Sequence, residues 1–550
     1  MRSFIPPFSF GTASLLAAAI VQVVYLLQQA PFLNEYVLTV DDTYYYLEIS
    51  RNIARLGWST FDGLHQTSGV QLLWTVLLVA LAKLVTDPLL FMRAMLVVCV
   101  ILNVTAGVLL RRLASAVHSS PVGEIAAVLW SLVLISSGST LTGMEFSLHL
   151  SIITGTLLAL YRVLDSGLAT RGAVVLSVMA TLNFWTRLDS ALFSVLVLLL
   201  PSARLLSGRP ARWQSRIVTM WAIPAAGALL YIATCYWLAG TPLPISGLVK
   251  AYYASAHFAD YSWWLAASGR LLWWLRIQAQ PATLLVSSVI GLDAATAPLA
   301  LRGSLALAAL WTVLLMFRRS AQPDHHDRQL AGLSLSIWLA SAVHAWLVVA
   351  SVGHFSHVTS HYYGWSLVAW CLMTALLLNG AVREMSAPRR RGVVGATTAL
   401  VVLVQVVTVS MRLASPIDMT SLRNVRTDLI GWIAANLPEG APIASWNAGQ
   451  FGYFLTRPVV NLDGLVNDTD FLNSLRRGEP VVNYLRREGV RYVVDYNDPD
   501  LSMPYLADWD RTMLFRGQIP WADVDQLQKR AAGGRTLYVL RLKDVAETNR

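Results

Sequence analysis

The sequence predicts a polytopic α-helical membrane protein that ends in a small external α/β domain. Of its 550 residues, 55% are apolar and only 13% are charged, whereas a typical soluble domain has about 25% charged residues. Many apolar segments are longer than the roughly 18 residues that suffice to cross a bilayer. Charged residues become frequent only after about residue 414. We therefore divide the chain into a membrane part, 1–414, and an external domain, 415–550.

The membrane part contains enough apolar segments for about 11 to 14 transmembrane helices. The first, 8–29, lacks a small-residue cleavage site and is expected to remain in the protein. A Trp-rich segment at 259–275 is either a further span or an interfacial helix. The other candidate spans are 70–86, 89–110, 121–138, 145–164, 171–186, 188–203, 217–239, 282–300, 303–317, 330–352, 362–380 and 393–413.

Basic residues orient these helices, because loops on the cytoplasmic side are rich in Lys and Arg. The membrane part holds 15 acidic and 26 basic residues, so the net charge of +10 reflects topology rather than nucleic-acid binding. Arginine clusters near 204–216, 318–328 and 383–391 mark three cytoplasmic loops. The segments expected outside are the loop 30–69, the turn near 187–189, the stretches 240–253 and 354–361, and everything after 415.

One observation conflicts with this topology. Arg111 and Arg112 have the character of a cytoplasmic loop. Two complete crossings at 70–86 and 89–110 would nevertheless place both arginines outside. The topology is consistent only if one of these two segments does not cross the bilayer completely.

The external domain has the alternating pattern of a small α/β fold of about 130 residues. Its strand-like runs are 458–462, 492–495 and 536–540, and its helical patterns include 425–435 and 471–488. Two polar, glycine-containing turns, 445–450 and 461–467, follow strands. They form either a carbohydrate surface or only tight turns.

The first loop concentrates the acidic residues of the membrane part. Five of the 15 lie between residues 35 and 62, and two of them, Asp41 and Asp42, are adjacent. Ionised acids beside a bilayer are costly and usually functional. A carboxylate at the mouth of a membrane cavity can accept a proton from an attacking hydroxyl. Asp41 and Asp42 are therefore the candidate catalytic residues, with a simple helix cap as the alternative role for one of them.

Residues 41–56 have the periodicity of an amphipathic helix. Tyr45, Ile49 and Ile53 share its apolar face, and Glu48 faces polar partners on another side. We expect this helix to lie in the plane of the membrane interface.

The remainder of the first loop is polar and contains glycines. Its residues His65, Gln66 and Thr67 are candidate ligands for sugar hydroxyls or phosphate. The alternative is a turn that only returns the chain to the membrane.

Four charged residues interrupt apolar helices near the expected outer side. Glu145, Arg187 and Asp189 are candidate substrate-binding residues, and the alternative for the pair Arg187 and Asp189 is that they satisfy one another structurally. Lys250 suits a phosphate leaving group, because a cation beside an external cavity can pair with phosphate.

Three histidines, His354, His357 and His361, fall within eight residues. His357 and His361 have the i, i+4 spacing of metal ligands on a helix, but no HExxH motif accompanies them. We regard them as candidate phosphate or substrate ligands, with an ordinary interfacial cluster as the alternative. The three cysteines show no metal or disulfide spacing, and the sequence contains no nucleotide-binding loop that would indicate an ATP-driven pump.

The order of motifs in the first loop is specific. Asp41-Asp42 is followed by Tyr44, then by Arg-Asn-Ile-Ala at 51–54, Gly-Trp at 57–58, and a turn that ends in Gly-Val-Gln-Leu-Leu-Trp at 69–74. This layout resembles the GT-C superfamily of integral-membrane glycosyltransferases, and most of all its bacterial, arabinofuranosyltransferase-like members. Shorter matches to similar members occur at 143–145, 187–189, 244–250, 447–449 and 463–465.

The resemblance implies an inverting enzyme with its active site outside the membrane. The implied donor is a polyprenyl-phosphate-linked sugar, and the implied acceptor is a cell-envelope glycan, lipid or protein. Asp41 or Asp42 would be the general base, and Tyr44 and Tyr45 would contact substrate. The implied location is the inner membrane of a bacterium, with the active site and the C-terminal domain on the periplasmic side.

The same resemblance leaves two points open. Many relatives have an Arg before a Tyr pair in a late external loop, where this chain has His361 and then Tyr362, so phosphate binding there is less secure. Members of the superfamily also differ in metal dependence. No cofactor is certain, and a divalent cation, Mg²⁺ or Mn²⁺, bound by Asp42 is the alternative.

Two other functions are compatible with a polytopic membrane chain. A transporter or flippase of lipid-linked sugars would require ionisable groups at mid-membrane depth and internal repeats. A non-catalytic envelope assembly factor would use the C-terminal domain as a binding module. The acidic residues gather at the expected outer side and no repeat is visible, so the sequence favours a glycosyltransferase.

Overall fold

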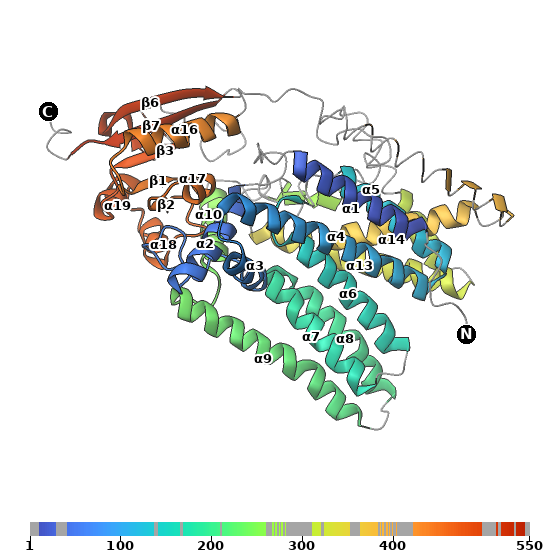
Figure 1. The fold of residues 1–550 in the computed structure, drawn as a ribbon. Helices are drawn as coiled ribbons and strands as arrows, with labels where there is room; N and C mark the ends of the chain where they lie inside the picture. Colours follow the sequence, from blue (N-terminus) through green and yellow to red (C-terminus); the bar gives the residue numbers. More distant parts are fainter. Residues whose placement is uncertain are drawn as a thin grey trace.

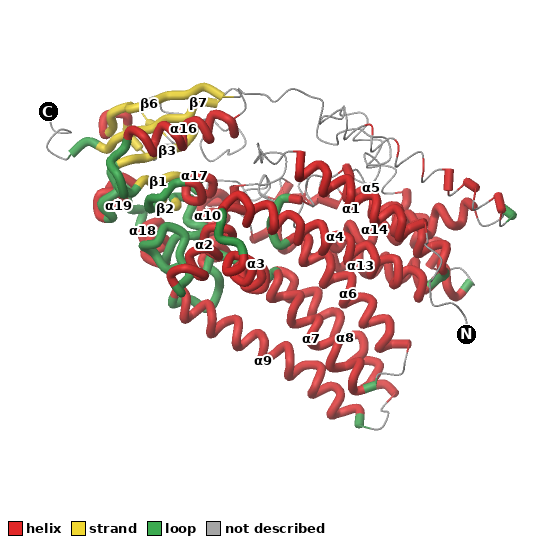
Figure 2. The backbone as a smooth tube through the Cα atoms, viewed as in Figure 1, coloured by secondary structure: helices red, strands yellow, loops and turns green. Residues whose placement is uncertain are grey.

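The computed structural model shows a bundle of helices with a sheet-containing domain at one end (Figure 1, Figure 2). The predicted span 282–300 and most of 393–413 lie outside the residues that the structure describes. The described residues are 10–28, 41–136, 141–165, 169–208, 212–259, 311–320, 324–351, 364–382, 422–497, 519–532 and 535–544, with short pieces within 267–281, 385–407 and 513–514.

Six of the described helices are long and apolar enough to cross a membrane, by length and composition. Three further apolar helices accompany them, namely α1 (Phe10–Gln28), α3 (Leu72–Leu84) and α5 (Ser120–Ser136). The prediction of a polytopic α-helical membrane fold is thereby confirmed. The six are α4 (Pro88–Val117), α6 (Phe146–Asp165), η3 with α8 (Leu188–Ser190 and Ala191–Gly208), α9 (Trp213–Ala239), α13 (His325–Ser351) and α14 (Gly364–Val382).

The length of α3 bears on the conflict in the predicted topology. This helix has 13 residues, which corresponds to about 20 Å at 1.5 Å per residue. The apolar core of a bilayer is about 30 Å thick. The length of α3 therefore agrees with the expectation that one of the two segments does not cross the bilayer completely, and the side of the membrane on which Arg111 lies stays a prediction.

Helix α4 lies at the centre of one half of the bundle, packed against α1, α5 and α6. Its Gly107 allows close approach, because a side chain there would overlap Leu15 of α1 and the Trp130 ring of α5. The Trp130 indole is buried and donates a hydrogen bond to the Asn103 carbonyl oxygen over 2.9 Å. A polar ring edge is thus satisfied inside an otherwise apolar core.

The C-terminal domain contains a five-stranded mixed sheet with the order β2-β1-β3-β7-β6. β1, β2 and β3 run parallel, whereas β7 is antiparallel to both β3 and β6. A second, two-stranded sheet joins β4 to β5. The strands are β1 (Ile443–Ser445), β2 (Val459–Asn461), β3 (Tyr492–Asn497), β4 (Met513–Leu514), β5 (Ile519–Pro520), β6 (Val524–Ala532) and β7 (Arg535–Leu542).

Helices connect the parallel strands, as parallel pairing requires. The prediction of one continuous helix over 471–488 is wrong, because the chain turns at Gly478, which has a φ of +67°, and Pro480 follows. Two short helices result. The helices of this domain are α16 (Leu422–Asn436), α17 (Gly449–Phe454), α18 (Thr469–Arg476) and α19 (Val481–Arg487), with a 3₁₀ turn η7 (Trp521–Asp523) before β6.

Helix α2 (Asp41–Leu56) lies between the bundle and the C-terminal domain (Figure 1). Its bounds agree with the predicted helix, but nine of its 16 residues are buried. One hydrophobic cluster combines Tyr45 of α2 and Trp74 of α3 with Phe451 and Val539 of the C-terminal domain. The apolar core is therefore continuous across the two parts of the chain.

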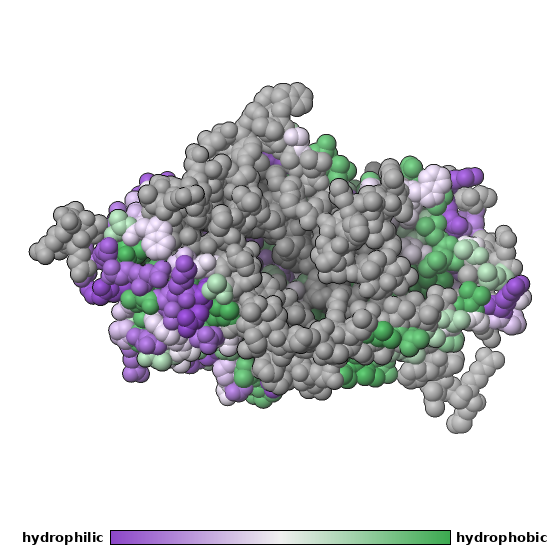
Figure 3. All heavy atoms as spheres, turned by 90° about the horizontal axis from the view of Figure 1, so that it is seen from above, coloured by the Kyte–Doolittle hydropathy of each residue, from purple (hydrophilic) through white to green (hydrophobic). Residues whose placement is uncertain are grey.

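The distribution of side chains agrees with this arrangement. Figure 3 shows hydrophilic residues gathered at the end where the C-terminal domain lies, and hydrophobic residues along the bundle. The described helices α4 and α9 expose large apolar side chains such as Ile101, Leu229 and Trp237. Such a surface is stable against lipid and unfavourable in water.

Candidate active site

Asp41 ties the start of α2 to the C-terminal domain. Its carboxylate accepts hydrogen bonds from the backbone N–H groups of Gly449 (3.0 Å) and Gln450 (3.2 Å), the first residues of α17. Arg426 of α16 lies 3.4 Å away. A carboxylate satisfies the free N–H groups at a helix N-terminus and interacts favourably with the helix dipole. Asp41 thus caps a helix 408 positions further along the chain.

Asp42 is in a different situation, because successive helix residues project about 100° apart. It accepts no hydrogen bond from any of the described residues. Burial raises the pKa of Asp42 from 3.8 to about 6; Lys250 opposes the shift, and Asp41 and Glu145 add to it. A carboxylate with uncommitted oxygens and a pKa near 6 is suited to accept a proton at neutral pH.

Lys250 reaches this region from α10 (Ile245–Ala259). The backbone N–H of Ile245 donates a hydrogen bond to Ser68 Oγ over 3.1 Å, which fixes the start of α10 against the first loop. The positive charge of Lys250 lowers the pKa of Asp42. The structure therefore brings the predicted cation close to one of the two predicted catalytic acids.

Tyr45 connects α2 to a carboxylate of the C-terminal domain. Its hydroxyl donates to Asp463 Oδ2 over 3.0 Å and accepts from Asn461 Nδ2 over 3.0 Å. Asp463 also accepts the Leu465 backbone N–H over 2.8 Å. Burial raises the pKa of Asp463 to about 7, with further contributions from Asp42 and Asp41. Three aspartates of two domains thus lie within electrostatic reach of one another.

The ring of Tyr44 packs against aromatic side chains of α17. It is fully buried, and its ring contacts Tyr453 and Phe454 of α17, with centroids 5.5 and 5.7 Å away. Arg51 completes this contact by donating to the Tyr453 carbonyl oxygen over 3.1 Å. The structure thus places the predicted substrate contact Tyr44 in the interface that holds α2 against α17.

His65 forms an ion-paired bridge to the C-terminal domain. Its Nδ1 lies 2.6 Å from Asp62 Oδ2 and its Nε2 lies 3.2 Å from Glu488 Oε2. Burial alone would lower the pKa of His65, but the hydrogen bond and charge of Asp62, with a contribution from Glu488, raise it to about 9. The imidazole is therefore protonated at neutral pH and is engaged on both nitrogens.

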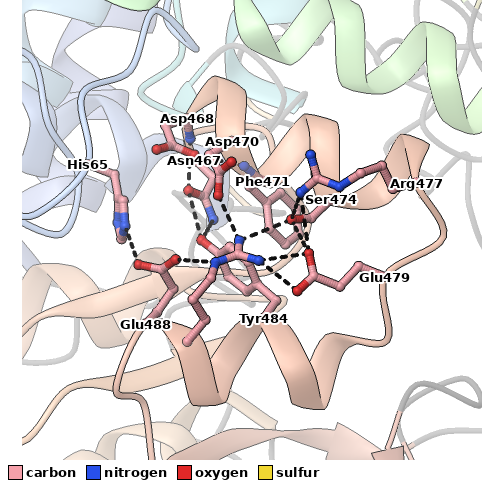
Figure 4. A network of polar contacts seen from close by, with 11 residues as sticks. His65, Asn467, Asp468, Asp470, Phe471, Ser474, Arg477, Glu479, Tyr484 and Glu488 are labelled. Atoms are coloured by element: carbon pink, nitrogen blue, oxygen red, sulfur yellow. Dashed lines mark hydrogen bonds and ion pairs between the residues drawn. The ribbon is translucent and has the colours of Figure 1, made fainter.

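Figure 4 shows how this bridge continues into the C-terminal domain. Glu488 lies next to Arg487, which also pairs with Glu479 (2.6 Å) and Asp470 (2.7 Å). The Arg487 guanidinium stacks over the Tyr484 ring. This network fixes α18 and α19 on the side of the domain that faces the first loop.

Gln66 and Thr67 shape the loop itself. Gln66 is exposed and pairs with Thr60 in an isolated β-bridge. Thr67 is buried, and its hydroxyl accepts the Gly69 N–H over 3.1 Å. These contacts form a turn that directs the chain back to the bundle, and the substrate contacts of Gln66 and Thr67 stay a prediction.

Glu145, Arg187 and Asp189 form a buried ion-pair cluster. Arg187 donates to Glu145 Oε1 over 2.5 Å and to both oxygens of Asp189 over 3.1 and 2.9 Å. His344 of α13 adds its Nε2 at 3.2 Å from Asp189 Oδ2 and stacks on Trp365. The predicted alternative, mutual satisfaction, is therefore what the structure shows for the paired atoms. Glu145 Oε2 has no hydrogen-bond partner among the described residues.

Comparison with other proteins agrees with this architecture. A family described as a domain of unknown function, DUF8728, matches residues 418–539. No protein of curated function shows significant sequence similarity to the chain. The apo crystal structure of the Archaeoglobus fulgidus oligosaccharyltransferase is similar with a TM-score of 0.53 and 12% identity, over 90% of this chain and 70% of that chain. The chain has a GT-C-like fold.

Two further solved structures have lower scores. The archaeal oligosaccharyltransferase AglB from Archaeoglobus fulgidus, in complex with an inhibitory peptide and a dolichol-phosphate, gives a TM-score of 0.46 at 13% identity over 89% of this chain and 70% of that chain. ArnT from Cupriavidus metallidurans bound to undecaprenyl phosphate gives 0.39 at 12% identity, over 97% and 98%. With TM-scores below 0.5, these two likenesses add nothing to the fold assignment.

Part of the predicted site cannot be placed in this GT-C-like fold. His357, His361 and Tyr362 lie outside the described residues. Among the described residues, no group of three or more His, Cys, Asp or Glu side chains could hold a metal ion. Both acidic groups, Asp41 and Glu145, and the cation Lys250 act electrostatically on Asp42, and a divalent cation bound by Asp42 stays a prediction.

Sequence reasoning missed several residues of this region of the GT-C-like fold. Asp463 belongs to a predicted polar turn and to a short match with the GT-C superfamily at 463–465, but the sequence assigned it no role, although its position directly after a strand of a parallel pair is where ligands bind. Arg426, His344 and Glu488 gave no local signal, because each acquires its partner from a distant segment.

Proposed function

We propose that this protein is an inverting glycosyltransferase that uses a polyprenyl-phosphate-linked sugar as donor. The acceptor is a hydroxyl group of a cell-envelope glycan, lipid or protein. The GT-C-like fold and the motif order of the first loop support this class of reaction. We further propose that the protein resides in a bacterial inner membrane, with α2 and the C-terminal domain on the periplasmic side.

The observation that carries the proposal is the contrast between the two adjacent aspartates. Asp41 is committed to two backbone N–H groups of α17 and to Arg426. Asp42 has no hydrogen-bond partner among the described residues and has a pKa raised by burial to about 6. We therefore assign Asp42 as the general base and Asp41 as a positioning residue that holds the start of α2.

The chemical step follows from this assignment. The acceptor hydroxyl gives its proton to the Asp42 carboxylate while its oxygen attacks the anomeric carbon of the donor. The bond from that carbon to the phosphate oxygen breaks, and its electron pair leaves with the polyprenyl phosphate. Lys250 faces the same region and stabilises the phosphate charge. A single displacement from the opposite side inverts the anomeric configuration.

The other predicted substrate residues keep supporting roles in this proposal. The Glu145–Arg187–Asp189 cluster lies near Asp42, since the negative charge of Glu145 contributes to the raised pKa of Asp42. Its net negative charge suits sugar hydroxyls better than phosphate. His357, His361 and Tyr362 remain proposed contacts of the donor, on the basis of the family resemblance alone.

The proposal is tested with purified full-length protein in proteoliposomes, polyprenyl-phosphate sugars and a panel of hydroxyl acceptors. We expect Asp42→Asn to lose transfer by about 10²–10⁴-fold, the usual contribution of a general base. Asp41→Asn should lose about tenfold or less, because the amide keeps the shape of the helix contact. Equal transfer by wild type and Asp42→Asn would overturn the assignment of the base.

The same assay separates the alternative functions. Movement of the lipid-linked sugar across the vesicle without formation of a glycosidic bond would identify a flippase. Glycan binding without transfer or movement would identify an assembly factor. Either result contradicts the proposed reaction.

A further inference from the structure

Asp463 is a half-buried acid, and the described residues around it provide no cation to offset its charge. Its carboxylate receives only neutral donors, the Tyr45 hydroxyl and the Leu465 backbone N–H. No described Lys, Arg or His forms an ion pair with it. Burying a carboxylate without a cation is costly. Asp495 of the same domain shows the contrasting, structural pattern, because it ties together the turn at 445–447 through four hydrogen bonds.

The turn that carries Asp463 is held by three elements of the candidate active site. Gly69 of the first loop contacts the Leu465 carbonyl so closely that any side chain at position 69 would overlap it. Val249, the neighbour of Lys250 on α10, packs against Gly464, whose φ of +78° favours glycine. Tyr45 of α2 supplies the third contact. The turn is therefore positioned by the residues that surround Asp42.

The position of Asp463 in the sheet also indicates a ligand-facing role. The residue follows β2 directly, and the adjacent parallel strand β1 ends at Ser445 beside it. Ligands of open parallel sheets bind beyond the carboxyl ends of their strands. On α2, Tyr45 stands three residues after Asp42 and therefore shares its face of the helix. The carboxylate held by Tyr45 thus lies on the same side of α2 as Asp42.

We propose that Asp463 binds the acceptor, by holding a hydroxyl group next to the one that Asp42 deprotonates. This inference rests on the proposed function. It narrows the acceptor to a molecule with neighbouring hydroxyl groups, a sugar or another polyol, because two carboxyl groups at one site match two adjacent hydroxyls. The C-terminal domain then supplies acceptor recognition, while the membrane part supplies the base and the phosphate contact. The raised pKa of Asp463, about 7, lets its carboxyl group act either as acceptor or as donor of the hydrogen bond at neutral pH.

The test pairs an enzyme variant with a substrate variant in the full-length reconstituted protein. The acceptors are a polyol-type sugar that the wild type glycosylates and its analogue without the neighbouring hydroxyl. For wild type, removal of that hydroxyl should lower kcat/KM by about 10–100-fold, the effect of a hydrogen bond to a charged group. Asp463→Ala should show a similar loss with the intact acceptor, mainly through KM of the acceptor, and no further loss with the analogue.

Tyr45→Phe should reproduce part of the Asp463→Ala effect. In the double variant it should add little to the effect of Asp463→Ala, because the tyrosine acts through that carboxylate.

Asp525→Asn is the matched control, since Asp525 lies on the outer strand β6 and pairs only with Arg541 among the described residues. Its kinetics should equal those of wild type. The melting temperature of each variant in detergent distinguishes a loss of binding from a loss of folding.

The outcomes separate a failure of the acceptor contact from a failure of the proposed function. If the wild type transfers sugar, and the wild type and Asp463→Ala discriminate equally between the two acceptors, the inference is wrong and the proposed function stands. Loss of kcat with unchanged acceptor KM also contradicts it. If the wild type transfers no sugar to any acceptor while it binds the donor lipid, the proposed function itself fails.

Discussion

Asp41 and Asp42 show how adjacent identical residues acquire different roles. The helical rotation between them turns one carboxylate toward the N-terminus of α17 and leaves the other without a hydrogen bond from the described residues. The first accepts hydrogen bonds from two backbone N–H groups and lies beside Arg426. Burial raises the pKa of the second from 3.8 to about 6. Their chemistry is therefore decided by partners that come from other segments.

A pH profile measures the state of Asp42 directly. We expect kcat/KM of the wild type to rise with pH and to level off above about 6, as Asp42 loses its proton. Lys250→Met should move this inflection to higher pH, because removal of the positive charge raises the pKa of Asp42. Lys250→Arg keeps the charge and should leave the inflection near its original position. An inflection that stays in place in Lys250→Met contradicts the assignment of Asp42 as the titrating group.

At the scale of elements, the close approach of backbones holds the site together. Gly449 of α17 packs directly on the Asp41 carbonyl, and Gly69 of the first loop packs on Leu465. Neither position has room for a Cβ atom. The contact between α2, the first loop and the turn after β2 thus depends on these two glycines. Both are needed because they lack a side chain, since neither has a positive φ.

Gly69→Ala tests this contact. The added methyl group meets a backbone carbonyl, which cannot move aside cheaply, so we expect a loss of about 1–3 kcal/mol of stability. Transfer activity should fall with it, because the turn that carries Asp463 is displaced. The matched control is Gly431→Ala in α16, where a Cβ atom meets nothing within 4 Å and the helix gains from alanine. Melting temperature and kcat/KM of both variants are the measurements, and a neutral Gly69→Ala would show that the turn is not tightly held.

At the scale of the whole molecule, the two parts of the chain share one core and several polar bridges. Apolar side chains of α2, α3 and α4 join those of the sheet in a single cluster. The His65–Glu488 contact and the Asp41 cap connect the first loop to α19 and α17. The C-terminal domain is therefore an integral wall of the candidate site rather than an appended module.

The His65 bridge makes the association of the two parts dependent on pH. Because the pKa of His65 is raised to about 9, its contribution to stability is complete below about 6.5 and is lost as pH rises through 9. We expect about 1 kcal/mol, or a few degrees in melting temperature, between pH 7 and pH 10. His65→Gln should remove this part of the pH dependence, and Glu488→Gln should reduce it. A wild-type and a His65→Gln curve that run parallel over this range would show that the bridge contributes nothing.

Local patterns predicted much of this structure. The helical periodicity of 41–56 gave the bounds of α2, and alternation in the tail gave β2, β3 and β7. The number of spans and the division at residue 414 stay predictions. Long-range partners were not predictable, because no local pattern encodes the approach of Asp463 to Tyr45, 418 positions apart. The burial of α2 on several sides was missed for the same reason, since its second partner is the distant helix α17.

The Asp41–α17 contact has a consequence for the order in which the protein matures. A ribosome adds Asp41 408 residues before it adds Gly449 of α17, and domains form in the order of their synthesis. During that interval the bundle can enter the membrane, but the start of α2 lacks its clamp and Asp463 does not yet exist. Under the proposed function, a half-made chain therefore lacks the acceptor contact and the clamp on α2, and transfer requires the complete C-terminal domain.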